Sequence, residues 1–586
     1  MERSLKVMCV VVLTVLLAVS LTACCDDGDN DTNHEPVAKA GLDQNVSTNS
    51  LVTLDGSGSS DPDGDSLTYS WTFTSMPDGS NATLSDSTVV NPTFTADVDG
   101  VYVVSLVVND GEANSKADDI SIMASTKVSV WLTTGDASNK LQQQPNITFS
   151  NGTGSNSLQI QVDEIEYQRM EGFGASLTDS SAWLISRLSE ADRNDLMSKL
   201  FSKSDGIGMS YVRQPIGASD FSLTAYTYND MPFGEADDSL DNFSIDHDKE
   251  YIIPLLQQAK SINSLLKIMA SPWSPPAWMK TNDHLNGGAL KLENFQVYAD
   301  YFVRFIQAYQ AEGLPIHAIT IQNEPAFWTA PYPCMQMTSN DQKGFIKDYL
   351  GPTFNIANIT TKIIIWDHNR ARDGAGDLDW DGKTYVTNIL NDANAKEYIA
   401  GSAWHAYEDC NGLDFVPEVQ TEVHNAFPDK GIYFTERTAS GHYSFSVNLY
   451  WCCHNIVIPA IRNWAKTVIL WNLALDINHG PRIVEPSGDC RGLVTINQST
   501  QTMEIEPEYY SLGHFSKFVD PCAYHIESNT YDDQIETVAF QNPDGAKVLV
   551  ALNASWSEPN DFDVQWDGKY FSYSLPIASI ATFVWD

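Results

Sequence analysis

The sequence predicts an α/β protein whose largest part is a (β/α)8 TIM-type barrel, with an N-terminal immunoglobulin-like β-sandwich ahead of it. Three observations support this fold class. The 586 residues are 42% hydrophobic, which is enough for several packed cores. Residues 35–125 contain short strand patterns separated by turn residues. From residue 171 onward, short apolar strands alternate with helical segments, as in parallel β/α units.

The first residues are typical of an export signal. "MERSLKVMCVVVLTVLLAVSLTACC" begins with basic Arg3 and Lys6, continues as an apolar run and ends in small residues. This pattern predicts a signal peptide over residues 1–23 rather than a spanning helix of the mature protein. The run Leu-Thr-Ala-Cys that ends at Cys24 resembles a bacterial lipobox. A lipobox implies a lipid on Cys24 and an acidic tether over residues 24–34, whereas simple secretion leaves Cys24 unmodified.

The predicted location of the protein and its net charge limit the kinds of partner that it can bind. The signal predicts an exported protein, lipid-anchored at the bacterial outer membrane or cell surface, with no other membrane contact. The chain has 34 Lys and Arg against 76 Asp and Glu, a net charge of −42. Such a chain repels nucleic acid and anionic lipid headgroups, so neither is expected as a partner. Six cysteines follow Cys25, their spacing matches no zinc pattern, and their pairing is left open.

Residues 35–125 have a pattern of their own. "LDGSGSSDPDGDSLTYSWTF" places turn residues before a strand, and "DGVYVVSLVVNDG" alternates before another turn. Short strands separated in this way predict a small β-sandwich. Both motifs resemble a PKD-type immunoglobulin-like domain, for which a spacer or weak adhesion role is expected. Asp61, Asp63 and Asp65 are either calcium ligands or, more ordinarily, part of an Asx-rich turn.

Eight strands are predicted in the following part of the chain. The helical segment 292–313 has apolar residues at helical spacing, ends at Gly313, and directly precedes the fourth strand. Strand after helix, repeated, predicts a closed parallel barrel. The strands are expected at 171–176, 209–215, 266–273, 318–325, 362–369, 399–407, 432–436 and 467–472.

Seven of these strands end in chemically interesting side chains. Barrels of this kind collect their reactive groups at the carboxyl ends of the strands, so these residues are expected to converge. They are Arg213, Trp273, Asn323 with Glu324, Asp367 with His368, His405 with Tyr407, Glu436, and Trp471.

Glu324 and Glu436 end the fourth and seventh strands, where they can face one another across the barrel mouth. Opposed carboxylates suit cleavage of a glycosidic bond, which needs a proton donor and a nucleophile or base. One carboxyl must stay protonated while the other stays ionised. A metal site or a structural pair is the competing interpretation, although no His-x-x-His or His-Glu-x-x-His spacing lies nearby. Trp273, Trp328 and Trp471 offer flat faces to a sugar, or else pack in the core.

At these residues the sequence resembles glycoside hydrolase family 30, in its glucosylceramidase-like branch. The resemblance rests on "GFGASLTDSSAW", "YVRQPIGASDFSLTAYTY", "SPWSPPAWMK", "TIQNEP", "FTE" and "ILWNLALDINHGP". It implies a retaining mechanism with Glu324 as acid/base and Glu436 as nucleophile. It also implies a side β-sandwich attached to the barrel (171–500) and built from residues 127–170 and 501–586.

Further roles follow from the resemblance. Arg213 would hold the carboxylate of Glu436 and keep it ionised. The residues expected around the sugar are Asn323 at the 2-hydroxyl, His405 and Tyr407 beside Glu436, Asp220 and Trp273 at the far hydroxyls, and Trp471 beneath the ring. This chain departs from the glucosylceramidases at Arg437-Thr438, which puts the preference for the leaving group in doubt.

The expected activity is retaining hydrolysis of a β-glucoside, with a carbohydrate or glycolipid as the partner and no cofactor or metal. Glucosylceramide and β-1,6-linked glucan remain open as substrates. Two other hypotheses are a non-catalytic carbohydrate-binding surface lipoprotein and a barrel glycosidase for a different β-glycan.

Overall fold

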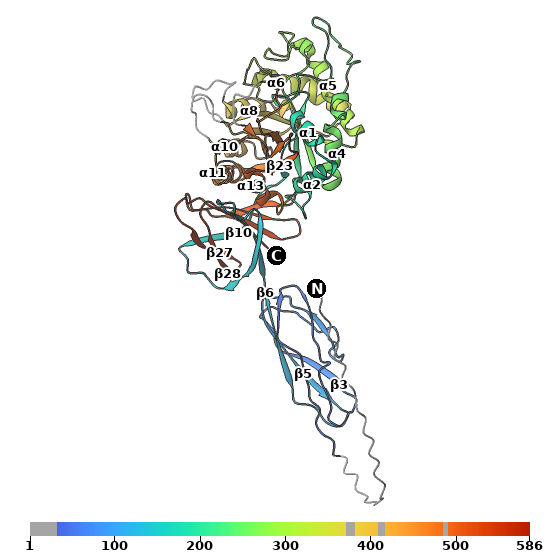
Figure 1. The fold of residues 1–586 in the computed structure, drawn as a ribbon, viewed down its shortest axis with the longest axis vertical. Helices are drawn as coiled ribbons and strands as arrows, with labels where there is room; N and C mark the ends of the chain where they lie inside the picture. Colours follow the sequence, from blue (N-terminus) through green and yellow to red (C-terminus); the bar gives the residue numbers. More distant parts are fainter. Residues whose placement is uncertain (1–31, 371–380, 408–415, 485–489) are drawn as a thin grey trace, which may run out of the picture. The chain divides into compact units, whose positions relative to one another are not determined.

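The computed structural model describes residues 32–370, 381–407, 416–484 and 490–586 (Figure 1). The chain divides into two compact units, Met1–Ser125 and Thr126–Asp586. The predicted signal peptide over residues 1–23 and the lipidation site Cys24 lie outside the described residues. No helix in the described part is long and apolar enough to cross a membrane.

The first unit is a small β-sandwich, which confirms the prediction for residues 35–125. Its core encloses Trp71, Tyr102 and Phe94. The Asp61 carboxylate accepts hydrogen bonds from the backbone of Asp63 and Asp65, as in an Asx-rich turn. One sheet has the order β1(Gln44–Ser47)-β6(Asp118–Ser125)-β5(Gly100–Asn109)-β3(Thr68–Ser75), and the other pairs β2(Leu51–Thr53) with β4(Thr93–Thr95).

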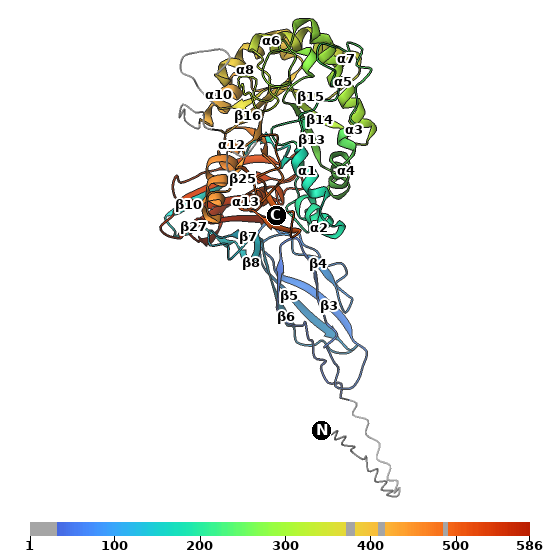
Figure 2. The ribbon, with the colours of Figure 1, turned by 45° about the horizontal axis from the view of Figure 1, so that its top comes forward.

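The second unit contains a closed parallel barrel of eight strands, as the sequence predicts. In Figure 2 the strands β13 to β16 lie inside an arc of helices that includes α4, α5, α6 and α8. The barrel strands are β11(Gly172–Ser176), β12(Tyr211–Ile216), β13(Lys267–Pro272), β14(Ile316–Thr320), β15(Lys362–Asn369), β16(Ile399–His405), β17(Gly431–Glu436) and β19(Ala465–Leu470).

Helices follow the strands along the chain. The segment expected at 292–313 forms α5, whose buried face includes Tyr298, Phe302 and Phe305, and the chain turns at Gly313 with a φ of +79°. The α-helices are α1(Asp179–Ser186), α2(Glu190–Phe201), α3(Asp246–Lys249), α4(Ile252–Ile262), α5(Phe295–Ala311), α6(Ser339–Phe345), α7(Gly351–Ile356), α8(Gly382–Leu390), α9(Ala393–Lys396), α10(Glu418–Ala426), α11(Phe445–Trp451), α12(Ile458–Arg462) and α13(Pro507–Ser516).

The inside of the barrel is packed with side chains, so a substrate can enter only at its mouth. A buried layer takes one side chain from each of seven strands: Tyr211, Met269, Ala318, Ile364, Ala403, Tyr433 and Ile469. In β11 a Cβ on Gly174 would lie 1.6 Å from the carbonyl oxygen of Tyr211, so only glycine fits there. At the amino end, Glu171 accepts hydrogen bonds from Lys362 (2.6 Å) and Tyr433 (3.0 Å), which closes the floor.

A ten-stranded sheet system lies beside the barrel and confirms the side β-sandwich. It combines strands from before and after the barrel, in the order β8-β7-β29-β26-β25-β24-β10-β27-β28-β9. Its core includes Ile160, Phe562 and Phe583. Its strands are β7(Lys127–Thr133), β8(Gln142–Thr148), β9(Ser150–Asn151), β10(Leu158–Arg169), β24(Tyr524–Ser528), β25(Ile535–Gln541), β26(Lys547–Asn553), β27(Asn560–Trp566), β28(Lys569–Leu575) and β29(Ile580–Trp585).

Short strands and two π-helical turns complete the second unit. Cys334, Cys452, Cys453 and Cys522 are not in disulfides. The remaining short elements are β18(Ala439–Ser440), β20(Ala474–Asp476), β21(Cys490–Arg491), β22(Val494–Asn497), β23(Thr502–Ile505), the 3-10 helices Ala277–Met279 and Leu292–Asn294, and the π-helical turns Ile346–Leu350 and Cys452–Val457.

Candidate active site

Glu324 and Glu436 both lie at the carboxyl end of the barrel. Glu436 is the last residue of β17. Glu324 stands on the loop after β14, because this strand ends at Thr320 and not at residue 325 as the sequence predicts. The loop is fixed by backbone hydrogen bonds to its neighbours, from Asn323 to Pro272 (2.8 Å) and from Glu324 to the carbonyl of the β15 residue Asp367 (2.9 Å). Glu324 has a φ of +49°, a strained conformation of the kind that collects at functional sites.

Arg213, on β12, joins three of the expected residues beneath the mouth. Its fully buried guanidinium donates hydrogen bonds to Glu436, to Asp367 (2.8 Å) and to Asn323 Oδ1 (2.7 Å). The contact with Glu436 is the one that the sequence predicts. The bond to Asn323 orients this amide so that its NH2 group remains for a ligand.

Asp367 is a buried anchor whose role the sequence analysis missed. Burial alone would raise its pKa, but the charge of Arg213 and hydrogen bonds from His405 and Ser271 hold the pKa well below its usual value. Thr320 and Thr435 each donate a further hydrogen bond of 2.7 Å. Asp367 is therefore a fixed negative charge. Its position at a strand end was visible in the sequence, but its partners come from β12, β13, β14, β16 and β17.

His405 connects the two glutamates. Its Nε2 lies 3.0 Å from Asp367 Oδ1, and its Nδ1 lies 3.2 Å from Glu324 Oε1 and 3.9 Å from Glu436 Oε1. The two glutamate oxygens therefore cannot be farther apart than the sum of the last two distances. Burial lowers the pKa of His405, but the charge of Glu436 and the hydrogen bonds to Asp367 and Glu324 outweigh burial and raise it to about 9.

The surroundings act differently on the pKa values of the two glutamates. Burial and the charges of Glu324 and Asp367 raise the pKa of Glu436, against the opposing effects of His405 and Arg213. Burial also acts to raise the pKa of Glu324, but His368 and His405 outweigh it and lower the pKa. Arg213 thus acts to lower the pKa of Glu436, as the sequence predicts, while burial and the neighbouring carboxylates oppose this effect. Because the two titrate together, a bound sugar can redistribute the shared proton.

The remaining predicted residues surround this pair. Tyr407 donates a hydrogen bond to Glu436 Oε1 (3.0 Å). Trp273 and Trp471 stack on each other with centroids 5.1 Å apart, and both are 3% exposed. The guanidinium of Arg213 lies 4.9 Å and 5.5 Å from their rings. These tryptophans form a rigid wall, and their contacts with a sugar stay predictions.

Asp220 is close enough to the glutamates to be affected by their charges. Burial, Glu436 and Glu324 together raise its pKa to about 7. His368, which the sequence analysis noted only as a strand end, places its Nδ1 3.5 Å from Glu324 Oε1. The mouth thus assembles paired carboxylates, a buried cation and an aromatic wall, which is chemistry suited to a glycosidic bond.

Comparison with known families decides the identity. The TIM-barrel domain of glycosyl hydrolase family 30 matches residues 170–519, and the family's beta sandwich domain matches residues 523–583. The chain belongs to glycosyl hydrolase family 30. It is therefore a glycoside hydrolase of a retaining β-glycosidase family. A PKD domain family matches residues 40–124.

The relatives of this family 30 hydrolase include endo-1,6-glucanases and a glucosylceramidase. The endo-1,6-beta-D-glucanase BGN16.3 of Trichoderma harzianum is 32% identical over 71% of this chain and 84% of its own length. The lysosomal acid glucosylceramidase of Mus musculus is 32% identical over 74% of this chain and 85% of its own length. A solved endo-beta1,6-glucanase is 33% identical, with a TM-score of 0.71, over 78% of this chain and 99% of its own.

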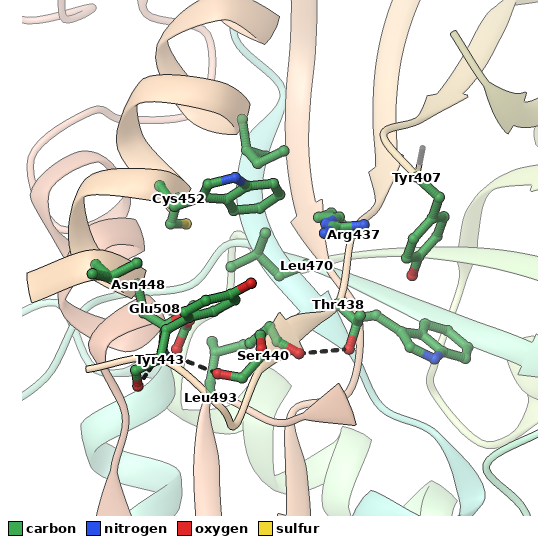
Figure 3. A pocket seen from close by; sticks show the side chains of 15 residues that line it. Tyr407, Arg437, Thr438, Ser440, Tyr443, Asn448, Cys452, Leu470, Leu493 and Glu508 are labelled. Atoms are coloured by element: carbon green, nitrogen blue, oxygen red, sulfur yellow. Dashed lines mark hydrogen bonds between the residues drawn. The ribbon is translucent and has the colours of Figure 1, made fainter. Parts of the chain in front are cut away.

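A cavity of about 510 Å³ in this family 30 hydrolase is lined by Arg437 and Thr438, which directly follow Glu436, the last residue of β17 (Figure 3). Tyr407 and Trp471 line both this cavity and the catalytic mouth. Arg437, the residue at which the chain departs from glucosylceramidases, lies 5.0 Å from the ring of Tyr407 and 4.5 Å from the ring of Trp451. The sequence marked Arg437 only as a departure, and its packing between two rings required the fold.

Asp220 provides a test of pH dependence. The unfolded chain loses this proton near the ordinary pKa of 3.8, whereas the folded protein keeps it to about 7. The stability contributed by this group therefore falls as pH rises between these values. Above pH 7, Asp220→Asn removes a charged group that burial disfavours, so we expect a melting temperature about 1–3 °C above wild type at pH 8.

The gain from Asp220→Asn should be much smaller near pH 4, where folded wild-type Asp220 keeps its proton and the unfolded chain has lost it only in part. Scanning calorimetry at the two pH values measures this difference. An equal gain in melting temperature at pH 4 and at pH 8 would contradict the raised pKa of Asp220. The same variant should raise KM for an aryl β-glucoside about tenfold at pH 8, because a neutral amide is a weaker acceptor for sugar hydroxyls than a carboxylate.

Proposed function

We propose that the protein hydrolyses β-1,6-linked glucan by double displacement, with Glu324 as acid/base and Glu436 as nucleophile. The observation that carries the proposal is the shared contact of both carboxylates with His405 at the carboxyl end of the barrel. Retaining enzymes place their carboxyl groups about 5–5.5 Å apart, so that one can attack while the other protonates.

In the first step, a Glu436 oxygen bonds to the anomeric carbon as the bond from this carbon to the leaving oxygen breaks. Glu324 gives the leaving oxygen its proton. In the second step, Glu324 removes a proton from water, the hydroxide oxygen bonds to the anomeric carbon, and Glu436 leaves. This proton from water replaces the one that Glu324 gave to the leaving oxygen, and His405, whose Nδ1 lies 3.2 Å from Glu324, is placed to orient its carboxyl group.

The choice of β-1,6-glucan has two supports. Relatives from Trichoderma harzianum, Aspergillus fumigatus and Neurospora crassa, together with a solved structure, are named endo-1,6-glucanases. In this chain Trp328 lies four residues after Glu324, the proposed acid/base. The loop between them is held by a hydrogen bond of 2.9 Å from the backbone N–H of Phe327 to the backbone carbonyl of Glu324. The Trp328 side chain is 56% exposed. An exposed indole beside the leaving group suits stacking of a second glucose.

Glucosylceramide is a second candidate. The mouse relative bears the name of this activity, and the cavity beside Glu436 has apolar walls from Val447, Ile456 and Leu493. Such walls suit a hydrocarbon leaving group. The guanidinium of Arg437 in the same cavity counts against two alkyl chains, because burying a charge beside hydrocarbon is unfavourable.

A substrate panel separates the two candidates. Initial rates are measured with β-1,6-glucan, gentio-oligosaccharides, detergent-dispersed glucosylceramide and an aryl β-glucoside. We expect kcat/KM for the glucan to exceed that for glucosylceramide by at least about tenfold, a difference of about 1.4 kcal/mol. The reverse ratio would replace the proposal with the second candidate. Preference for mannan or xylan over every glucoside would overturn both.

Trp328→Ala should act on polymer cleavage alone. Loss of one stacked ring is expected to raise KM for β-1,6-glucan about five- to tenfold and to leave the aryl glucoside within about twofold. Trp556→Ala is the matched control, since Trp556 is a 49% exposed tryptophan on the loop between β26 and β27. Equal effects of Trp328→Ala on both substrates would contradict a role in binding the leaving group.

We also propose that the enzyme is held at the cell surface by a lipid on Cys24, as the lipobox-like motif indicates. A surface anchor suits an enzyme whose substrate is an external polymer. Cys24→Ser should release the activity from the membrane fraction into the medium, and unchanged fractionation would contradict the anchor.

A further inference from the structure

We propose that Glu324, His368 and His405 form a binding site for a divalent transition-metal ion of the zinc or copper type, which reversibly inactivates the enzyme. The inference goes beyond the hydrolytic reaction, because it concerns an ion that the reaction does not need.

The three side chains have the spacing that such an ion requires. Their ligand atoms all lie within 4.8 Å of one another. His405 Nδ1 and His368 Nδ1 lie 3.2 Å and 3.5 Å from Glu324 Oε1. Tetrahedral zinc with bonds of about 2.0–2.2 Å has ligands about 3.3–3.6 Å apart, so the edge from His368 to Glu324 fits and the edge from His405 is shorter by about 0.1 Å. The third edge, between the two imidazoles, is at most 4.8 Å long and must shorten when the ion binds.

His368 supplies an independent reason to expect a ligand. Its side chain is buried, with 7% exposed, and its Nδ1 has no hydrogen-bond partner among the described residues. A buried polar atom without a partner is unfavourable. The ring lies against Trp366, with centroids 5.1 Å apart, which limits its rotation. An ion between this nitrogen and Glu324 would satisfy both atoms.

The surroundings of His405 match those of metal-binding histidines. A histidine that binds a metal through one ring nitrogen commonly donates the N–H of its other ring nitrogen to a carboxylate, which fixes the tautomer. Here Nε2 of His405 lies 3.0 Å from Asp367 Oδ1, and Arg213 holds Asp367 at 2.8 Å. This arrangement directs Nδ1 toward Glu324. Glu436 Oε1, 3.9 Å from the same Nδ1, or a water molecule can occupy a fourth position.

The ligand set selects the ion. Two imidazoles and one carboxylate suit Zn²⁺ or Cu²⁺, whereas Mg²⁺ and Ca²⁺ prefer oxygen ligands. The net charge of −42 attracts cations to the protein. An ion bound to Glu324 keeps its carboxylate ionised and coordinated, so that Glu324 can neither give a proton to the leaving group nor take one from water. Both steps of hydrolysis therefore stop while the ion is bound, and a chelator should restore them.

Titration calorimetry of the full chain with ZnCl2 tests binding without relying on catalysis. We expect one ion per chain with a Kd of about 1–10 μM and no heat from MgCl2 at the same concentrations. His368→Asn should weaken binding at least about 30-fold, and Glu324→Gln should weaken it similarly. His454→Asn is the matched control, because His454 contacts Glu536 at 2.7 Å outside this site. The control should bind zinc as wild type does.

Inhibition is measured on an aryl β-glucoside, with the rate of each variant expressed relative to its own metal-free rate. Wild type and His454→Asn should lose at least about 90% of their rate at a zinc concentration about ten times the Kd and recover it with EDTA. His368→Asn should require about 30-fold more zinc. Circular dichroism checks that each variant is folded, and His368→Gln replaces the asparagine variant if that one is not.

Absence of a binding heat at about 1 mM ZnCl2, or equal affinity in His368→Asn and wild type, would overturn the metal site. Failure of the proposed glucan activity would leave the calorimetric result unaffected, so the two proposals fail separately.

Discussion

Glu436→Ala is expected to reduce kcat on every β-glucoside by about 10⁴-fold or more, because it removes the carboxylate that forms the glycosyl intermediate in the proposed mechanism. Glu324→Ala is expected to behave differently. Cleavage of β-1,6-glucan should fall about 10³-fold, since its alkoxide leaving group needs a proton. A dinitrophenyl β-glucoside needs none, so its first step should be nearly unchanged and should appear as a burst before slow hydrolysis.

Two measurements complete this test. Azide should accelerate the Glu324→Ala variant and yield a β-glucosyl azide, because the small anion replaces base-activated water. A 2-deoxy-2-fluoro-glucoside should add its mass to the peptide that contains Glu436. Glu171→Gln is a matched control at the opposite end of the barrel, where it should alter stability more than turnover. If Glu324→Ala is as inactive on the dinitrophenyl glucoside as on glucan, the two roles are wrongly assigned.

Arg213→Met is expected to cause the largest loss of stability among single substitutions in the mouth. It leaves two buried carboxylates, Asp367 and Glu436, without the cation that each contacts. Breaking a buried ion pair by removing one partner typically destabilises a protein by about 3–5 kcal/mol. Urea unfolding at pH 7.5 measures this loss, and kcat should also fall because Glu436 and Asn323 lose their positioning contacts.

The loss in Arg213→Met should depend on pH. Asp367 has a lowered pKa in the folded wild type, so its contribution is present above its ordinary pKa and is lost as pH falls. Without Arg213 this pKa rises, and the variant should recover part of its stability at pH 5. The double variant that combines Arg213→Met with Asp367→Asn should recover part of the lost stability at pH 7.5.

Lys383→Met serves as the control for charge removal in general. Its exposed pair with Glu422 (2.7 Å) should contribute less than about 1 kcal/mol. A destabilisation by Arg213→Met no larger than this would show that the buried carboxylates do not depend on the arginine.

The sequence predicted the barrel because strand and helix periodicity are local properties. All eight expected strands are present, and those carrying Arg213, His405 and Glu436 have the expected end residues in the mouth. The fourth strand was predicted too long. Ile321 continues the alternating pattern, but the end of β14 is set by bonds from the following loop to Pro272 and Asp367, which the local pattern does not reveal.

The roles of Asp367 and His368 also depend on distant neighbours. Both were visible as strand-end residues, yet Asp367 became an anchor only through Arg213 and His405, which come from other strands. The effect of two imidazoles that lower the pKa of Glu324 has the same origin, because His368 and His405 are brought beside it by β15 and β16. Pairwise distances across the barrel decide these effects.

The order of strands in the side sheet affects how the protein is made. β7 lies between β8 and β29, and β10 lies between β24 and β27. The ribosome therefore synthesises β7 and β10 several hundred residues before their partners emerge, and their open edges must be kept from other chains during that time. A nascent chain that stops short of β29 leaves β7 and β26 with unpaired edges. Final folding of the side sheet is thus coupled to completion of β29.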